Sequence, residues 1–176
     1  MKSDNHNFNN ILPELKEELA KRVLILDGAM GTMIQRKSIP DSVYESSALL
    51  RDTDVPLKGN NDILNLLCPE VIRDIHQSYV DAGADLITTN TFSSNKISQQ
   101  EYGCGNYIKE MNKAGAGIAR QVADACKERK IWVVGSVGPT AKSLSLASDI
   151  NHPEERLCSF DEMAEAYQEQ ISSLID

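Results

Sequence analysis

The stretch "VLILDGAMGT", residues 23–32, decides the fold class of this chain. Four apolar residues lead directly into Asp27, and two glycines, Gly28 and Gly31, follow it. A short, uninterrupted apolar run is typical of a strand that is buried on both faces, as in a parallel sheet. A short helix is predicted next, over residues 29–35. The stretch therefore predicts a buried strand that ends in a turn, with an acidic side chain at the point where the strand ends.

The same layout occurs twice more, at "DLITTNTF" (residues 85–92) and "IWVVGSVGPT" (residues 131–140). Between these strands, residues 69–84 and 106–130 carry apolar side chains at helical spacing. Pro69 opens the first of these helices, a position that proline favours. The chain thus alternates between strands and helices, an order that is typical of βαβ units.

A last helix is predicted over residues 159–176, where Ser159 and Glu162 have the spacing of a capping box. We expect its apolar stripe to face the core; the stripe comprises Phe160, Met163, Tyr167, Ile171 and Leu174. A shorter helix is predicted over residues 11–22, and residues 37–61 have the composition of a loop.

In parallel α/β folds the carboxyl ends of the strands lie on one face, where sites are built. We therefore expect Asp27, Asn90 and the loop at Gly138 to converge. The last helix stops at Asp176, whereas the equivalent earlier helix continues into a glycine-containing turn and a strand. The predicted fold class is α/β, namely the N-terminal part of a (β/α)₈ TIM barrel. About three parallel strands with their helices occupy residues 11–176, truncated before the fourth strand.

Composition excludes several classes of function. The chain is 41% hydrophobic and 25% charged, which is ordinary for a globular domain, and its net charge of −8 comes without a basic patch for nucleic acid. No apolar run approaches the ~18 residues of a membrane span. The polar residues 1–10 lack the apolar core of a secretory signal, and we expect a disordered leader. The four cysteines lack metal or redox spacing, which favours reduced thiols and a cytoplasmic location.

Five stretches, taken in order, match a known family: "ILDGAMGTMIQ", "LKGNNDIL", "AGADLITTNTF", "GSVGPT" and "FDEMAEAYQEQ". From about residue 12 to residue 176 the chain resembles the zinc-dependent homocysteine S-methyltransferase family, and within it the N-terminal homocysteine-binding module of the cobalamin-dependent methionine synthase type. The resemblance implies a (β/α)₈ barrel that binds homocysteine at the strand ends. It also implies a zinc ion on three cysteines, which converts the thiol to the nucleophilic thiolate. The resemblance further implies that the methyl group comes from methylcobalamin, originally from methyltetrahydrofolate, and that the product is methionine.

The zinc cysteines of that family lie in an Asn-Cys step and a Gly-Gly-Cys-Cys step, and neither occurs here. No metal role is therefore assigned to the four cysteines of this chain, Cys68, Cys104, Cys126 and Cys158. We assign no catalytic residue in this chain. We expect the zinc ligands and the cobalamin- and folate-binding modules to lie outside it. This chain alone is therefore expected to be inactive. Two positions depart from the family pattern, because Thr88 replaces a frequent acid and Ala141 a frequent asparagine. Each change is expected to remove a polar group near the mouth of the site.

Asp27 is the first candidate for substrate binding. Its carboxylate is expected to receive the α-ammonium group of homocysteine through a charge-assisted contact. The alternative is that Asp27 caps the N-terminus of the following helix. Gly28, Ala29 and Gly31 either present backbone N–H groups to the substrate carboxylate or form a tight turn that requires only glycine geometry.

The ends of the other strands supply the remaining candidates for substrate binding. Asn90 and Thr91 either shape the pocket wall or bond to their own chain at the strand exit. Ser136 and Gly138 either line the pocket floor or only turn the chain. The polar stretch "KGNND", residues 58–62, either folds over the mouth or is a solvated loop.

Three functions stay open: the homocysteine-binding part of a methyltransferase, which the resemblance implies, a non-catalytic fragment, and a phosphate- or nucleotide-binding α/β domain. The last is disfavoured, because "GAMGT" matches neither G-x-G-x-x-G nor a P-loop and no basic residue stands in the strand-end turns before Lys142. His76 lies near the apolar face of its helix, where we expect a structural histidine with satisfied ring nitrogens rather than a ligand.

Overall fold

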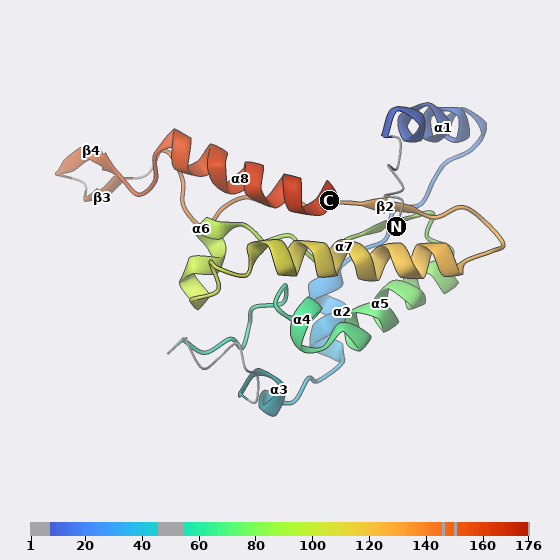
Figure 1. Cartoon of the computed structure of the whole chain (residues 1–176), viewed down its shortest axis with the longest axis horizontal. Coiled ribbons are helices and arrows are strands. Elements are labelled where there is room, and N and C mark those ends of the chain that lie inside the picture. The colour runs from blue at the N-terminus through green and yellow to red at the C-terminus, as the bar shows by residue number, and fades with distance from the viewer. Residues whose placement is uncertain (1–7, 46–54, 146, 150, 176) are drawn as a thin grey trace, which may run out of the picture.

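The computed structural model describes residues 8–45, 55–145, 147–149 and 151–175, and Figure 1 gives its arrangement. Helices dominate this part of the chain, and the strands are short. In chain order the elements are α1 (Phe8–Lys21), α2 (Met30–Arg36), α3 (Asp41–Glu45), α4 (Leu64–Leu67), α5 (Pro69–Asp81), β1 (Leu86–Thr88), α6 (Lys96–Gln99), η2 (Gln100–Tyr102), α7 (Ile108–Ala125), β2 (Trp132–Val134), β3 (Ala147–Asp149), β4 (His152–Arg156) and α8 (Phe160–Ile175).

A small parallel sheet lies at the centre of the fold. β1 pairs with β2 in parallel, with Leu86 opposite Trp132. On the other side of β1, residues 23–27 add a parallel bridge between Leu26 and Leu86, and the amide of Asp27 donates to the carbonyl of Leu86 at 2.9 Å. The three predicted strand regions therefore run side by side in chain order. This confirms a mixed α/β fold with a parallel sheet.

The main helices pack against one another in chain order, α2 on α5, α5 on α7 and α7 on α8. In Figure 1, α7 (yellow to orange) crosses the molecule between α8 on one side and α4 and α5 on the other. The predicted apolar faces of α5 and α7 are buried, as Ile72, Ile75, Ile118 and Val122 illustrate. The periodic pattern predicted these two helices correctly because each has one face in the core.

Two surfaces that we predicted to be buried are exposed. Val23 is 85% exposed, because residues 23–27 pair with β1 along one edge and with no strand along the other edge within the described residues. In α8, Phe160 is 72% exposed. The helix buries Ala166, Gln170 and Ser173 instead, because it packs on α7 through small and polar side chains.

Several short elements were not predicted. The region of residues 37–61, read as a loop, contains α3, and the turn of residues 147–156 contains an antiparallel hairpin of β3 and β4. Segments of three to five residues are too short to display a hydrophobic period. α1 begins at Phe8, inside the predicted leader, and residues 1–7 lie outside the described part of the chain.

The start of α8 carries the predicted capping box. The carboxylate of Glu162 accepts from the amide of Ser159 at 2.8 Å, and the hydroxyl of Ser159 accepts from the amide of Glu162 at 3.2 Å. Two backbone donors that a helix N-terminus leaves unpaired are thereby satisfied. This local prediction is confirmed.

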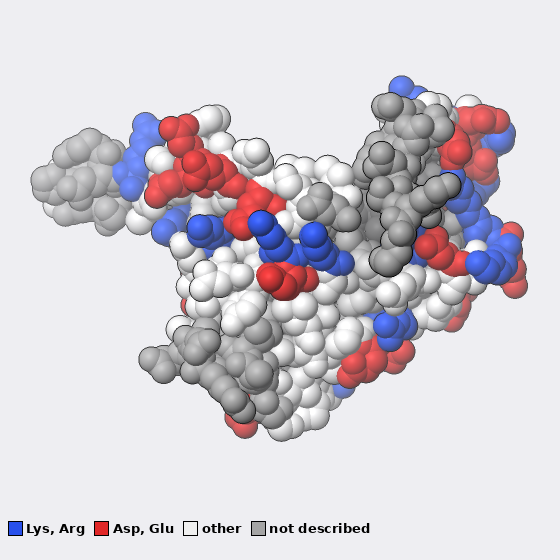
Figure 2. Space-filling model, in the orientation of Figure 1, with Lys and Arg blue, Asp and Glu red and all other residues white. Residues whose placement is uncertain are grey.

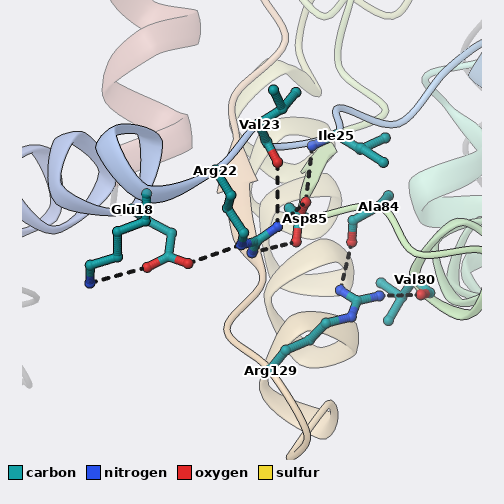
Figure 3. A network of polar contacts seen from close by, with 9 residues as sticks. Glu18, Arg22, Val23, Ile25, Val80, Ala84, Asp85 and Arg129 are labelled. Carbon is teal, nitrogen blue, oxygen red and sulfur yellow. Dashed lines mark hydrogen bonds and ion pairs between the residues drawn. The ribbon is translucent and has the colours of Figure 1, made fainter.

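A polar network joins the end of α1 to the base of β1 (Figure 3). The guanidinium of Arg22 donates to both carboxylate oxygens of Asp85 at 2.9 Å and to Glu18 at 3.0 Å. Arg22 holds the pKa of the buried Asp85 carboxyl below its usual range. Nearby, Arg129 donates to the carbonyl of Ala84 at 2.8 Å. Ion pairs and hydrogen bonds, rather than apolar packing, therefore hold α1 against the sheet.

The surface has no single dominant charge on the face drawn in Figure 2. The charged side chains of α8 are all acidic, with basic side chains of other segments beside them, both signs occur around α1, and much of the remaining surface is uncharged. Within the described ranges, no helix is long and apolar enough to cross a bilayer.

Candidate functional site

A cavity of about 370 Å³ lies where the parallel segments end. It is bounded by the turn after residue 27, by the polar stretch before α4, by the end of β1 and by the loop after β2. The described residues that line it are Gly28, Met30, Gly31, Gly59, Asn60, Asn61, Asp62, Thr88, Thr89, Asn90, Phe92, Ser93, Tyr102 and Ser136. The convergence of strand ends that the sequence predicts therefore occurs.

Asp27 is half-buried, and its carboxylate is bound by Thr88. The amide of Thr88 donates to Oδ2 at 2.8 Å, and its hydroxyl donates to Oδ1 at 2.9 Å. Burial raises the pKa of Asp27, and these two hydrogen bonds oppose the rise. Asp27 is not among the residues that line the cavity, whereas Thr88 is. The N-cap of α2 is Ala29, without a side-chain hydrogen bond, so the alternative role of Asp27 as the cap is wrong.

The turn at residues 28–31 contributes Gly28 and Gly31 to the cavity lining, but not Ala29. Neither glycine has a positive φ, so a turn that requires glycine conformation is not the reason for their presence. An added Cβ at Gly28 would lie 3.6 Å from the hydroxyl of Tyr79, which is ordinary contact. The turn forms part of the wall without backbone strain.

Of the two candidate residues at the end of β1, one lines the cavity and the other lies behind the cavity wall. Asn90 lines the cavity, and its amide nitrogen donates to the carbonyl of Asn61 at 2.9 Å and to Oδ1 of Asn65 at 3.1 Å. Thr91 is fully buried and does not line the cavity; its hydroxyl donates to the carbonyl of Ser136 at 2.8 Å. Asn90 therefore lies in the cavity wall, as the first interpretation expects. Both residues also form hydrogen bonds to the chain, as the second interpretation expects.

The loop after β2 divides in the same way. Ser136 lines the cavity, whereas Gly138 is buried and does not. The amide of Gly138 donates to the carbonyl of Phe92 at 2.9 Å, and an added Cβ would approach that oxygen to 2.6 Å. The hydroxyl of Tyr167 donates to the carbonyl of Gly138 at 3.2 Å. Gly138 thus joins two loops and α8 at a point of close backbone approach.

The stretch "KGNND" is the functional feature that the sequence reading underestimated. The interpretation as a solvated loop is wrong, because Asn60 and Asp62 are buried and four residues of the stretch line the cavity. Asn60 and Gln99 exchange side-chain hydrogen bonds of 2.7 and 3.2 Å. Oδ2 of Asp62 accepts from the amide of Ser93 at 2.6 Å, and burial raises the pKa of Asp62 to about 6. Two signals in the sequence pointed to this stretch: its run of short amide and acid side chains, and its place in the family-like motif "LKGNNDIL".

The two departures from the family pattern keep polar contacts in this structure. The hydroxyl of Thr88 binds Asp27, and the amide of Ala141 donates to the hydroxyl of Ser98 at 3.1 Å. His76 is fully buried, and neither ring nitrogen has a partner within the described residues. The expectation of satisfied nitrogens is therefore wrong. Burial lowers the pKa of His76 to about 4.

The described residues do not fit a metal ion. All four cysteines are free thiols, and none lies at the end of a parallel strand. In the described part of the chain, no three His, Cys, Asp or Glu side chains gather in a way that could hold a metal. The polar side chains that line the cavity, such as Asn90 and Ser136, could bind and orient a ligand.

Comparison with known protein families gives the class to which this chain belongs. Residues 24–176 match the model of the homocysteine S-methyltransferase family, and the chain belongs to this family. The metallated form of the homocysteine methyltransferase MmuM from Escherichia coli is similar in fold, with a TM-score of 0.65 and 21% identity over 92% of this chain and 53% of that one. Its oxidised form has a TM-score of 0.64 and 22% identity, over 92% and 52%. This chain spans about half the length of these solved structures.

Proposed function

We propose that this chain is the homocysteine-binding part of a methyltransferase and that homocysteine occupies the cavity at the strand ends. The complete reaction transfers a methyl group to the thiolate of homocysteine and gives methionine. The observation that supports this proposal is the cavity itself. It is lined by Gly28, Gly31, Asn90 and Ser136, all of which were predicted from the sequence as substrate-binding residues.

The chemistry of the lining suits a small zwitterion. No lysine or arginine is among the described residues that line the cavity, so a substrate carboxylate would meet neutral donors such as the side chains of Asn61 and Ser93. Phosphate sites normally use basic side chains or a glycine-rich loop, which makes a nucleotide the weaker candidate. A volume of about 370 Å³ lies near the lower end of the usual range for ligand pockets, roughly 300–1,000 Å³.

The predicted contact between Asp27 and the ammonium group stays a prediction. Each oxygen of that carboxylate already accepts a hydrogen bond from Thr88. A carboxylate oxygen has a second lone pair, so the two roles are compatible. Ala29, Thr91 and Gly138 were also predicted to bind substrate, but they do not line the cavity, and we propose that they support its wall.

The finer features of the proposal rest on the five motifs of the sequence. They are the (β/α)₈ TIM barrel architecture, the methionine synthase type, a zinc cofactor with ligands outside this chain, and methylcobalamin as the donor. A cytoplasmic location is proposed from the spacing of the four cysteines. Homocysteine and the cobalamin- and folate-binding modules are the corresponding partners. Because the described residues do not fit a metal, their proposed role is limited to holding the amino acid.

Titration calorimetry of the 176-residue chain with L-homocysteine, and separately with ATP, tests this proposal. We expect saturable heat with L-homocysteine and none with ATP. Heat with ATP alone would reject the proposal in favour of a nucleotide-binding domain. No heat with either ligand would reject unaided binding of homocysteine by this chain.

A further inference from the structure

The apolar run after the stretch "KGNND" contains a buried amide. In "ILNLL", residues 63–67, Asn65 stands between two leucines and is only 2% exposed. A buried amide is unfavourable unless its donors and its acceptor are paired. Asn65 belongs to α4 and is not among the described residues that line the cavity. The role of this side chain therefore depends on what its amide contacts behind the cavity wall.

Main-chain carbonyls fix the orientation of the Asn65 amide. Its Nδ2 donates to the carbonyl of Asn90 at 2.7 Å and to the carbonyl of Met111, in α7, at 3.1 Å. A carbonyl can only accept, so the amide nitrogen of Asn65, and not its oxygen, must face these two groups. Oδ1 of Asn65 is thereby left to accept from Nδ2 of Asn90, at 3.1 Å.

This orientation decides how the side chain of Asn90 can meet a ligand. Asn90 lines the cavity, and its Nδ2 carries two hydrogens. One is donated to Oδ1 of Asn65, and the other to the carbonyl of Asn61 at 2.9 Å. Both hydrogens are therefore used within the protein. Any further hydrogen bond of this side chain is one that its oxygen accepts.

Asn65 also holds Asn90 in place, because it contacts both the main chain and the side chain of that residue. Around Asn65 the packing is close, since α4 packs on α7 and an added Cβ at Gly115 would lie 2.7 Å from Nδ2 of Asn65. The amide of Asn65 has little room to turn. Asn90 is thus oriented before a ligand arrives, which lowers the entropic cost of binding.

We propose that Asn65 is a positioning residue, which orients the amide of Asn90 so that the cavity wall presents a hydrogen-bond acceptor to a donor group of the ligand. This inference rests on the proposed function, and the donor groups of homocysteine are its ammonium group and its thiol. The predicted contact of Asp27 with the ammonium group is compatible with it, because an ammonium group has three hydrogens to donate.

Titration calorimetry with L-homocysteine tests the role of Asn65. Asn65→Leu keeps the branched shape of the side chain and removes the amide, and we expect it to bind about 3- to 10-fold more weakly, the scale of one neutral hydrogen bond. Val122→Ala is the control, because Val122 is buried beside Val80 and Ile87 and does not line the cavity. It should lower stability, as large-to-small core changes do, and bind as the wild-type chain does. Equal weakening in both variants would overturn the inference, because it would reflect only lost stability.

A double-mutant cycle shows whether Asn65 acts through Asn90. If it does, the variant with both Asn65→Leu and Asn90→Ala should bind L-homocysteine no more weakly than Asn90→Ala alone. Additive losses would overturn the inference. If the wild-type chain and Asn65→Leu bind equally well, the inference fails and the proposed function stands. If the wild-type chain does not bind L-homocysteine, the proposed function fails and this inference fails with it.

A crystal structure of the wild-type chain with L-homocysteine gives a readout without any substitution. It decides the question if circular dichroism finds Asn65→Leu unfolded. We expect the ammonium nitrogen or the thiol sulfur within hydrogen-bond distance of Oδ1 of Asn90, which is up to ~3.2 Å for nitrogen. A ligand carboxylate against the side chain of Asn90, or no ligand contact with that side chain, would overturn the proposal.

Discussion

The buried carboxyl of Asp62 leads to a prediction about the stability of the chain at different pH. Its pKa of about 6 lies above the ordinary aspartate value, so the folded chain favours the protonated form. Stability should therefore fall as pH rises from about 4, where an aspartate ionises in the unfolded chain, to above 6. Between pH 4 and pH 7 the wild-type chain should lose up to ~3 kcal/mol relative to Asp62→Asn. Urea unfolding at the two pH values measures this difference, and parallel pH profiles would contradict it.

His76 should respond to pH in the opposite direction. Its imidazole is fully buried without partners in the described residues, and its pKa is about 4. The neutral ring is favoured in the folded chain, so its contribution is complete above the unfolded pKa of ~6.5 and is lost as pH falls towards 4. His76→Met should remove up to ~3 kcal/mol of this acid sensitivity. Urea unfolding at pH 7 and pH 4 checks it, and an unchanged acid sensitivity would show that the ring finds a partner.

Single residues also mark the limit of what the sequence predicts. The carboxylate at position 27 and the glycines after it indicated a site at the strand end, and Gly28 and Gly31 do line the cavity. The choice of partner for Asp27 was not predictable, because Thr88 is 61 positions away along the chain. The burial of Asp62 was not predictable for the same reason, because its partners Ser93 and Ser94 come from the loop after β1. Hydrogen bonds between distant segments leave no periodic trace in a sequence.

Among the elements, α7 offers a matched pair of glycine substitutions. An added Cβ at Gly115 would lie 2.7 Å from Asn65 and Thr91, whereas one at Gly117 would meet nothing within 4 Å. Gly115→Ala should therefore cost ~1–3 kcal/mol, the usual cost of overpacking. Gly117→Ala should instead stabilise the chain by up to ~1 kcal/mol through helix propensity. Thermal unfolding of both variants tests the pair, and equal effects would mean that α7 does not pack closely against Asn65 and Thr91.

The capping box of α8 gives a second prediction for an element. Ser159→Ala removes the hydroxyl that accepts from the amide of Glu162 and donates to its carboxylate. The expected loss is ~0.5–2 kcal/mol in the free energy of unfolding. Ser172→Ala, a matched change at an exposed position of the same helix, should be neutral or slightly stabilising. Urea unfolding measures both, and equal losses would assign the effect of Ser159 to something other than the cap.

A helix was predictable where it is long and its apolar stripe is buried. The other elements were less predictable. α5 and α7 follow their apolar period because the period and the core coincide. α8 has an equally clear stripe, yet Phe160 and Ile171 are exposed, and Gln170 is buried because its amide donates to the carbonyl of Thr91 at 2.7 Å. Hydrophobic pattern predicts that a face exists, but the packing partner decides which face is covered.

At the scale of the whole molecule, α1 is attached differently from the other helices. Leu12 and Leu19 are exposed, so α1 buries little apolar surface. Its fixed contacts are the bidentate pair of Arg22 with Asp85 and the ion pair of Glu14 with Lys130. A helix held mainly by polar contacts should open at lower cost than the packed body.

Substitution of Arg22 tests this attachment. Arg22→Ala leaves the buried carboxylate of Asp85 without its cation, and we expect a loss of roughly 1–3 kcal/mol in the free energy that holds α1 in place. Backbone hydrogen exchange should accelerate in Phe8–Lys21 and stay unchanged in Pro69–Asp81, because Arg22 has no ion pair with that helix among the described residues. Lys21→Ala removes only exposed pairs with Glu17 and Glu18 and should have a small effect. Equal acceleration in both variants would mean that α1 frays from its own weak helicity and that the pair at Asp85 does not hold it.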